Sequence, residues 1–151
     1  MPPDDLTLTS MDTPGTKTPQ QVAHAMLAKD KFTEWMGLQV DEVGAGYCRL
    51  HYTVREDMLN GFAVIHGGVL FAAADSAFAF ACNSHGRLTL ALDASITFTR
   101  AAKAGDTLTV TAKELYCGNR TGLYEVRTTN AEQELVALFK GTAYRTSKTV
   151  V

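Results

Sequence analysis

Residues 60–86, NGFAVIHGGVLFAAADSAFAFACNSHG, constrain the fold of this chain more than any other stretch. Between positions 69 and 81 the residues are apolar almost all round, which predicts a helix buried on every side rather than one with a solvated face. A single charged residue, Asp75, interrupts this run. Because a carboxylate is costly to remove from water, Asp75 should be paired, protonated or held for chemistry.

The predicted helix opens with Gly67 and Gly68 directly after His66. Small residues at a helix start let a ligand approach the free backbone N–H groups at the positive end of the helix dipole. One element therefore carries an end suited to binding an electrophile and, further along, an acid or base.

Length and charge limit the classes of protein to consider. A chain of 151 residues fits one domain. Its net charge of -2 argues against nucleic acid as a partner. Cys48, Cys82 and Cys117 are far apart, with no C-x-x-C pair and no metal-ligand spacing, so we expect free thiols, no metal and no organic cofactor.

Two further features bear on location. The N-terminus has no basic segment followed by an apolar run, so no signal peptide is expected. The apolar part of the predicted helix is shorter than the roughly 20 residues needed to span a bilayer. We therefore expect a cytoplasmic protein without membrane contact.

The N-terminal part divides into a tail and the start of a domain. Residues 1–17 are rich in Pro, Asp and Thr and predict a flexible tail, and residues 18–147 form the predicted single domain. Thr18 as N-cap, with Pro19 and Gln21 in a capping box, predicts an N-terminal helix that stops at Gly37.

The remaining segments alternate with the period of two that is typical of strands. In the strand that begins near Leu88, the apolar even positions should face the core. Two predicted strands precede the central helix and four follow it, over residues 38–43, 47–54, 88–98, 107–112, 123–129 and 135–144. The order predicts an α+β fold: a long central helix wrapped by an antiparallel sheet of about five to six strands, with an extra N-terminal helix.

The motif N-G-x4-H-G-G followed by A-D resembles the hotdog-fold acyl-CoA thioesterases, most closely the phenylacetic acid degradation (PaaI) type. Further similarity lies in TFTRAAKAGD and ALFKG, and the likeness covers roughly residues 32–145. It implies the hotdog fold and hydrolysis of aryl- or arylacetyl-CoA, such as hydroxyphenylacetyl-CoA, to the free acid and CoA. The motif residues are Asn60, Gly61, His66, Gly67, Gly68, Ala74 and Asp75.

The resemblance also implies roles for individual residues. Asp75 is the catalytic carboxylate, the backbone N–H of Gly67 polarises the thioester carbonyl, and Asn60 positions the carboxylate or its water. His66 either orients the H-G-G turn or touches substrate. Other members have a Ser or Thr in the following strand that assists the water, and Ser95, Thr97 or neither could do so here.

Asp75 can attack the thioester directly or act as general base on water, and the sequence leaves both open. At about 1.5 Å per residue, Asp75 lies roughly 12 Å along the helix from Gly67. If both act on one acyl carbon, they come from different subunits. We expect a two-fold dimer with shared active sites, Asn60, His66 and Gly67 coming from one chain and Asp75 from the other, and the family suggests a tetramer of two such dimers.

The other candidate residues concern the substrate. Apolar side chains near the motif suit an acyl group, and basic side chains at turns suit the phosphates of CoA, although each is also compatible with an ordinary solvated charge. The candidates are Gly68, Phe62, Phe71, Arg100, Lys103 and Arg120.

Two alternatives remain. A hotdog hydratase or dehydratase needs a His paired with its carboxylate, commonly five residues after an Asp, where this chain has Phe80. A hotdog module that binds acyl-CoA without turnover is the alternative outside the enzymes, and release of free thiol distinguishes it from a thioesterase.

Overall fold

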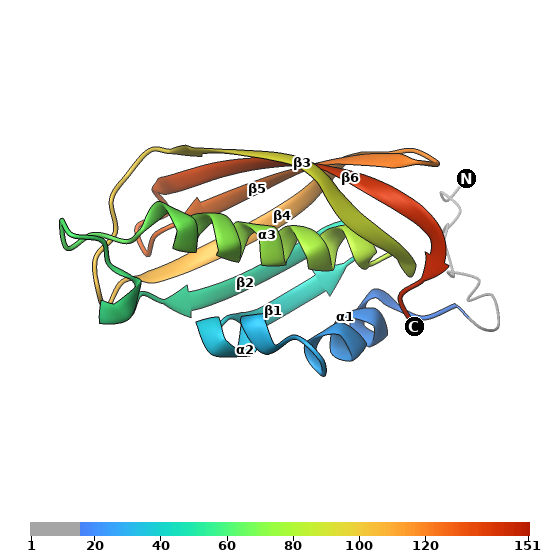
Figure 1. Ribbon diagram of the computed structural model, residues 1–151, viewed down its shortest axis with the longest axis horizontal. Helices are drawn as coiled ribbons and strands as arrows, with labels where there is room; N and C mark the ends of the chain where they lie inside the picture. Colours follow the sequence, from blue (N-terminus) through green and yellow to red (C-terminus); the bar gives the residue numbers. More distant parts are fainter. Residues whose placement is uncertain (1–15) are drawn as a thin grey trace, which may run out of the picture.

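The computed structural model describes residues 16–151, so most of the predicted tail lies outside the described part. Within it, the helices and strands follow the order expected from the sequence, except that two helices precede the first strand instead of one (Figure 1). The elements are α1 (Pro19–Leu27), α2 (Lys31–Met36), β1 (Gln39–Gly44), β2 (Tyr47–Thr53), a 3-10 turn η1 (Glu56–Met58), α3 (Gly67–Asn83), β3 (Arg87–Phe98), β4 (Thr107–Cys117), β5 (Thr121–Thr129) and β6 (Leu135–Thr149).

The six strands form one antiparallel sheet in the order β1-β2-β4-β5-β6-β3. Strand β3 therefore pairs with β6 rather than with β4, and residues 99–106 carry the chain across the sheet. Strand β6 continues to Thr149, beyond the predicted end at residue 144. Strands β1 and β3 lie at the two edges of the sheet. The outward-facing backbone N–H and C=O groups of β3 therefore have no strand partner within the described chain.

Helix α3 lies along the concave side of the sheet, which curves around it (Figure 1). The core between them is built on three aromatic side chains, Phe78 of the helix and Tyr124 and Phe139 of the sheet, with ring centroids 5.3 and 5.7 Å from that of Phe78. This is the predicted arrangement of a central helix wrapped by a sheet. No helix in residues 16–151 is long and apolar enough to cross a membrane.

The prediction that the central helix is buried on every side is wrong for the single chain. One stripe of α3, at one-turn spacing, stays partly or fully open to solvent and contains Gly68, Phe71, Ala72, Asp75 and Ala79. Apart from Asp75, the residues of this stripe are as apolar as those of the buried face, so the composition gives little sign of it. The open stripe faces the side on which β3 is the edge strand.

The prediction for β3 is also wrong in part. Leu90, Leu92 and Phe98 are 54, 64 and 52% exposed, whereas Thr89 is buried. Register shifts between Arg87 and Thr89 and between Ala91 and Asp93 break the simple alternation, and an edge strand has a neighbour on one side only. A single chain thus presents a continuous apolar edge beside the open stripe of α3.

The N-terminal helix starts as predicted. The Thr18 hydroxyl accepts a hydrogen bond from the Gln21 N–H at 3.2 Å, and the Gln21 side chain accepts one from the Thr18 N–H at 2.9 Å. The prediction that this helix continues to Gly37 is wrong: it ends at Leu27. A second short helix, capped by Asp30, follows and stops at Gly37, where φ is +72°. The Gln20 side chain donates to the Val43 carbonyl oxygen at 2.8 Å and ties α1 to β1.

Replacing Thr18 with Ala removes this cap and should lower the free energy of unfolding by roughly 0.5–2 kcal/mol. Urea denaturation at one fixed protein concentration measures the change. Thr16→Ala is the matched control because Thr16 is exposed and precedes the cap, so its effect should stay within about 0.5 kcal/mol. Equal losses in both variants would contradict a specific capping role.

Candidate active site

The start of α3 presents one free backbone donor. The N–H of Gly68 donates to Nδ1 of His66 at 2.8 Å, so His66 is the N-cap of the helix. The N–H of Val69 donates to the His66 carbonyl oxygen at 3.0 Å. The Gly67 N–H has no acceptor in residues 16–151. A donor at a helix start, in line with the dipole, is a ready site for a developing negative charge.

The ring of Phe98 lies close to Gly67. A Cβ there would lie 2.9 Å from Cζ of Phe98, so a larger residue would have to displace the ring. A hollow of about 430 Å³ lies beside the helix start and gives access to Gly67. Its lining consists of Val64, Ile65, Gly67, Leu70, Phe98, Thr99, Arg100 and Ala101.

Asn60 shapes the loop that leads into the helix. Its side-chain oxygen accepts hydrogen bonds from the N–H groups of Phe62 at 2.9 Å and Val64 at 3.4 Å. Its amide NH2 group donates to no atom in residues 16–151 and stays available. Within one chain Asn60 therefore holds the loop, and Phe62 at its tip is 87% exposed.

Asp75 lies half-buried in the middle of α3, on the open stripe. Removal from water raises the pKa of its carboxyl group above the ordinary value for Asp. No donor in residues 16–151 hydrogen-bonds to it. It lines a second, mainly apolar hollow of about 300 Å³, together with Met26, Phe78, Ala79, Cys82, Asn83, Leu88, Thr89, Leu90, Ala91 and Val150.

The two hollows share no residue, so a single chain keeps Gly67 and Asp75 apart. Gly67 and Asp75 are eight residues apart on one helix, which separates them by about 12 Å along its axis. Each hollow holds one half of the predicted chemistry, a donor in the first and a carboxylate in the second.

The basic candidates fall into two groups. Arg100 lines the hollow at Gly67 and forms an ion pair with Glu134 at 2.6 Å, and Lys103 is exposed on the connection that follows β3. Arg120 lies in the β4–β5 turn, where its guanidinium donates to the Tyr144 hydroxyl at 3.4 Å. Tyr144 pairs with Leu90, near the other end of β3, so one chain does not bring Arg120 to Gly67.

The sequence left open whether Ser95 or Thr97, both on β3, assists the attacking water. Phe98 faces α3, and alternation along the strand directs Ser95 and Thr97 to the opposite face of the sheet. Neither side chain faces Asp75 in its own chain. Phe71, also a candidate, makes an edge-to-face contact with Phe139, with ring centroids 5.3 Å apart.

The sequence did not single out Phe98 and Met26, which line the two hollows. Both are apolar residues in segments expected to pack in a core, and only the strand order and the position of α1 show that they border solvent. No sequence pattern marks them.

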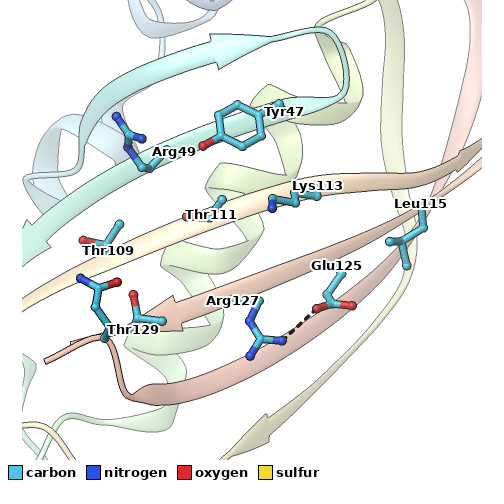
Figure 2. Close-up of a pocket in the computed structure, with 10 residues that line it drawn as sticks. Tyr47, Arg49, Thr109, Thr111, Lys113, Leu115, Glu125, Arg127 and Thr129 are labelled. Carbon is cyan, nitrogen blue, oxygen red and sulfur yellow. Dashed lines mark hydrogen bonds and ion pairs between the residues drawn. The ribbon is translucent and has the colours of Figure 1, made fainter. Parts of the chain in front are cut away.

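A third hollow, of about 360 Å³, lies on the face of the sheet away from α3 (Figure 2). Charged and hydroxyl side chains of β2, β4 and β5 line it, and Arg127 pairs with Glu125 at 3.2 Å. None of its lining residues is a predicted site residue. A solvated sheet face of this kind offers neither the helix start nor the buried carboxylate, so we place the candidate site at α3.

Comparison with known proteins shows the family of the chain. The sequence profile of the thioesterase superfamily matches residues 62–137, which include Gly67, Asp75 and Phe98. Acyl-coenzyme A thioesterase PaaI of Escherichia coli K12 is 42% identical over 130 residues, covering 86% of this chain and 93% of that protein. The chain belongs to the thioesterase superfamily. This thioesterase is therefore an enzyme, a thioester hydrolase.

Solved structures extend the similarity to three dimensions. The structure of the E. coli PaaI protein from the phenylacetic acid degradation operon is 41% identical and superposes on this thioesterase with a TM-score of 0.85, covering 87% of this chain and 95% of that one. A hypothetical thioesterase from Streptococcus pneumoniae TIGR4, solved with coenzyme A, is 26% identical, with a TM-score of 0.71 and coverage of 74 and 90%. The expected hotdog fold is confirmed.

Proposed function

We propose that this protein is an acyl-CoA thioesterase that hydrolyses aryl- or arylacetyl-CoA, such as hydroxyphenylacetyl-CoA, to the free acid and CoA in phenylacetate degradation. The observation that carries the proposal is the arrangement on α3: a free Gly67 N–H at the helix start and a half-buried Asp75 with no donor in its own chain. The similarity to E. coli PaaI supports the substrate class.

Hydrolysis of a thioester develops negative charge on the carbonyl oxygen. The Gly67 N–H, reinforced by the helix dipole, would donate to that oxygen, a contribution of about 10² to 10³ in rate for one such donor. His66 would hold the helix start in place through its bond to Gly68. This geometry favours a positioning role for His66 over direct contact with substrate.

Asp75 would supply the other half of the reaction. As nucleophile it would attack the carbonyl carbon and expel the CoA thiolate, leaving an anhydride that water hydrolyses. As general base it would take a proton from the attacking water. In both cases the ionised carboxylate is the active form, and the free NH2 group of Asn60 would orient the carboxylate or the water.

The two hollows become one site in a two-fold dimer. An exposed apolar edge such as β3 is a template for pairing with another strand. Antiparallel pairing of two β3 strands would set the Phe98 end of one beside the Leu90 end of the other. The Gly67 hollow of each chain would then face the Asp75 hollow of the second chain.

The same two-fold symmetry would bring together basic residues that lie far apart in one chain. Arg100 and Lys103 of one chain would lie on the same side of the shared site as the copy of Arg120 from the second chain, and together they suit the phosphates of CoA. The apolar hollow at Asp75 would take the acyl group, with Phe71 of the same helix and the copy of Phe62 from the second chain near its entrance. We further propose that two such dimers associate into a tetramer.

Thiol release from a panel of phenylacetyl-, hydroxyphenylacetyl-, benzoyl- and aliphatic acyl-CoAs tests the function. We expect kcat/KM to be highest for the aryl substrates because of the similarity to E. coli PaaI, and the largely apolar hollow at Asp75 is compatible with such an acyl group. Saturable binding of acyl-CoA without thiol release would instead support the non-catalytic binding module. Hydration of an enoyl-CoA would support the hydratase, but no histidine is among the residues lining the Asp75 hollow.

A further inference from the structure

A second cluster of chemically active side chains lies at the end of α3 opposite Gly67. His85 comes from the turn after the helix, and Glu114 and Cys117 come from the end of β4. One nitrogen, one carboxylate oxygen and one sulfur from these residues lie within 4.8 Å of one another. None of the three is used by the thioesterase chemistry, and the sequence spacing gave no sign of the cluster.

A β-bulge brings Glu114 and Cys117 to the same face of β4. Residues three apart on a regular strand point to opposite faces. Here the pairing register with β5 shifts between Glu114 and Tyr116, and Leu115 and Tyr116 are both largely exposed on the outer side. The extra residue turns Cys117 back toward Glu114. Bulges that redirect a side chain in this way are common beside functional sites.

The carboxylate of Glu114 is held at one oxygen and free at the other. Its Oε2 accepts hydrogen bonds from the Tyr124 hydroxyl at 2.6 Å and pairs with Nε2 of His85 at 2.7 Å, whereas Oε1 has no partner in residues 16–151. A carboxylate fixed by an outer hydrogen bond is typical of a metal ligand.

The surrounding backbone keeps space for this carboxylate. Gly46, in the β1–β2 turn at φ +66°, faces Glu114, and a Cβ there would lie 2.7 Å from Cβ of Glu114. The Gly46 N–H donates to the hydroxyl of Ser84 at 2.8 Å, which fixes the turn to the end of α3. The turn, the helix end and the bulge thus form a rigid frame around the cluster.

We propose that His85, Glu114 and Cys117 form a binding site for a zinc ion. Imidazole, carboxylate and thiolate are the three ligand types that Zn²⁺ takes in proteins, and three protein ligands leave a fourth position for water. All three residues are partly exposed, so the ion can enter from solvent. Tetrahedral zinc bonds of about 2.0–2.3 Å hold the ligand atoms roughly 3.3–3.8 Å apart. The His85 nitrogen and the Glu114 oxygen, now 2.7 Å apart, would therefore separate slightly, and atoms near the 4.8 Å limit would approach by about 1 Å. The ion would replace the His85–Glu114 hydrogen bond.

Titration of the tag-free full chain with Co²⁺ and Zn²⁺ tests the site. Co²⁺ should produce a sulfur-to-metal charge-transfer band, and Zn²⁺ should displace it and raise the melting temperature. Cys117→Ser should abolish the band and weaken Zn²⁺ binding by more than about 100-fold, beyond the 10- to 100-fold expected for an outer-shell change. His85→Gln should weaken it similarly, with thioesterase activity unchanged in both variants.

His51→Gln is the matched control, because His51 is also a partly exposed histidine paired with a carboxylate, Asp41, at 2.8 Å. The Zn²⁺ affinity of this variant should equal that of the wild type. The proposal is overturned if wild-type protein gives no charge-transfer band, or if Cys117→Ser binds Zn²⁺ as tightly as wild type. In either case the His85–Glu114 pair serves only as a hydrogen bond that ties α3 to β4.

Discussion

Replacing Asp75 with Asn should lower kcat/KM for the best acyl-CoA substrate by about 10² to 10⁴-fold, the range for loss of a catalytic base, and by more if Asp75 is the nucleophile. Asn keeps the shape of the side chain but can neither attack the thioester nor accept a proton from water. Ser76→Ala, at the next and partly exposed position of α3, is the matched control and should stay near wild-type activity.

The stability of the Asp75→Asn variant separates catalysis from structure. Burial raises the pKa of Asp75, so the folded state disfavours the charged form relative to the unfolded state. Above that raised pKa the carboxylate therefore destabilises the fold, and this penalty disappears as the pH falls through the pKa. Asn carries no such penalty, so the variant should be as stable as wild type or more stable at neutral pH. Loss of activity together with loss of stability would indicate a structural role.

The same pKa predicts the acid limb of the activity profile. Because the ionised carboxylate is the reactive form, kcat/KM should fall as the pH drops through the raised pKa of Asp75. The fall should begin at a higher pH than the ordinary Asp value of 3.8 would give. A pH series with the best acyl-CoA measures it, and a profile that stays flat down to that ordinary value would contradict catalysis by a desolvated Asp75.

The sequence predicted those parts of the fold that depend on local interactions. The capping box at Thr18 requires particular residues at particular positions and forms as expected. Gly37 also ends a helix, but this is the short α2 and not the single helix expected from Thr18 onward. The central helix and the strands follow from periodicity. The motif around Gly67 and Asp75 also marked the helix that carries the candidate chemistry.

The features that the sequence did not predict, the open edge of β3 and the cluster around Glu114, depend on contacts between residues distant in the chain. Leu90 and Leu92 have the same apolar character whether they face a core or an open edge, and only the pairing of β3 with β6 shows that they lie at an edge. His85 and Cys117 are 32 positions apart and meet because of one bulge. Neither the strand order nor the bulge can be predicted from the composition of the sequence or from the spacing of its residues.

Mixed dimers should show whether the active site is shared. Gly67→Ala places a Cβ 2.9 Å from Phe98 and should disturb the helix start, with a loss of about 10² to 10³-fold for one displaced donor. A purified heterodimer of Gly67→Ala and Asp75→Asn chains would contain one site with both defects and one with neither. It should recover about half the wild-type activity, although each parent homodimer keeps at most about one-hundredth of it.

The reciprocal heterodimer is the control. One wild-type chain paired with one chain carrying both substitutions gives, for a shared site, two sites with one defect each, and activity should stay as low as in the single variants. If Gly67 and Asp75 of the same chain acted together, this dimer would keep about half its activity and the first would have none. The two heterodimers contain the same residues and differ only in which chain carries them, so high activity in the first and low activity in the second can arise only if Gly67 and Asp75 of one site come from different chains.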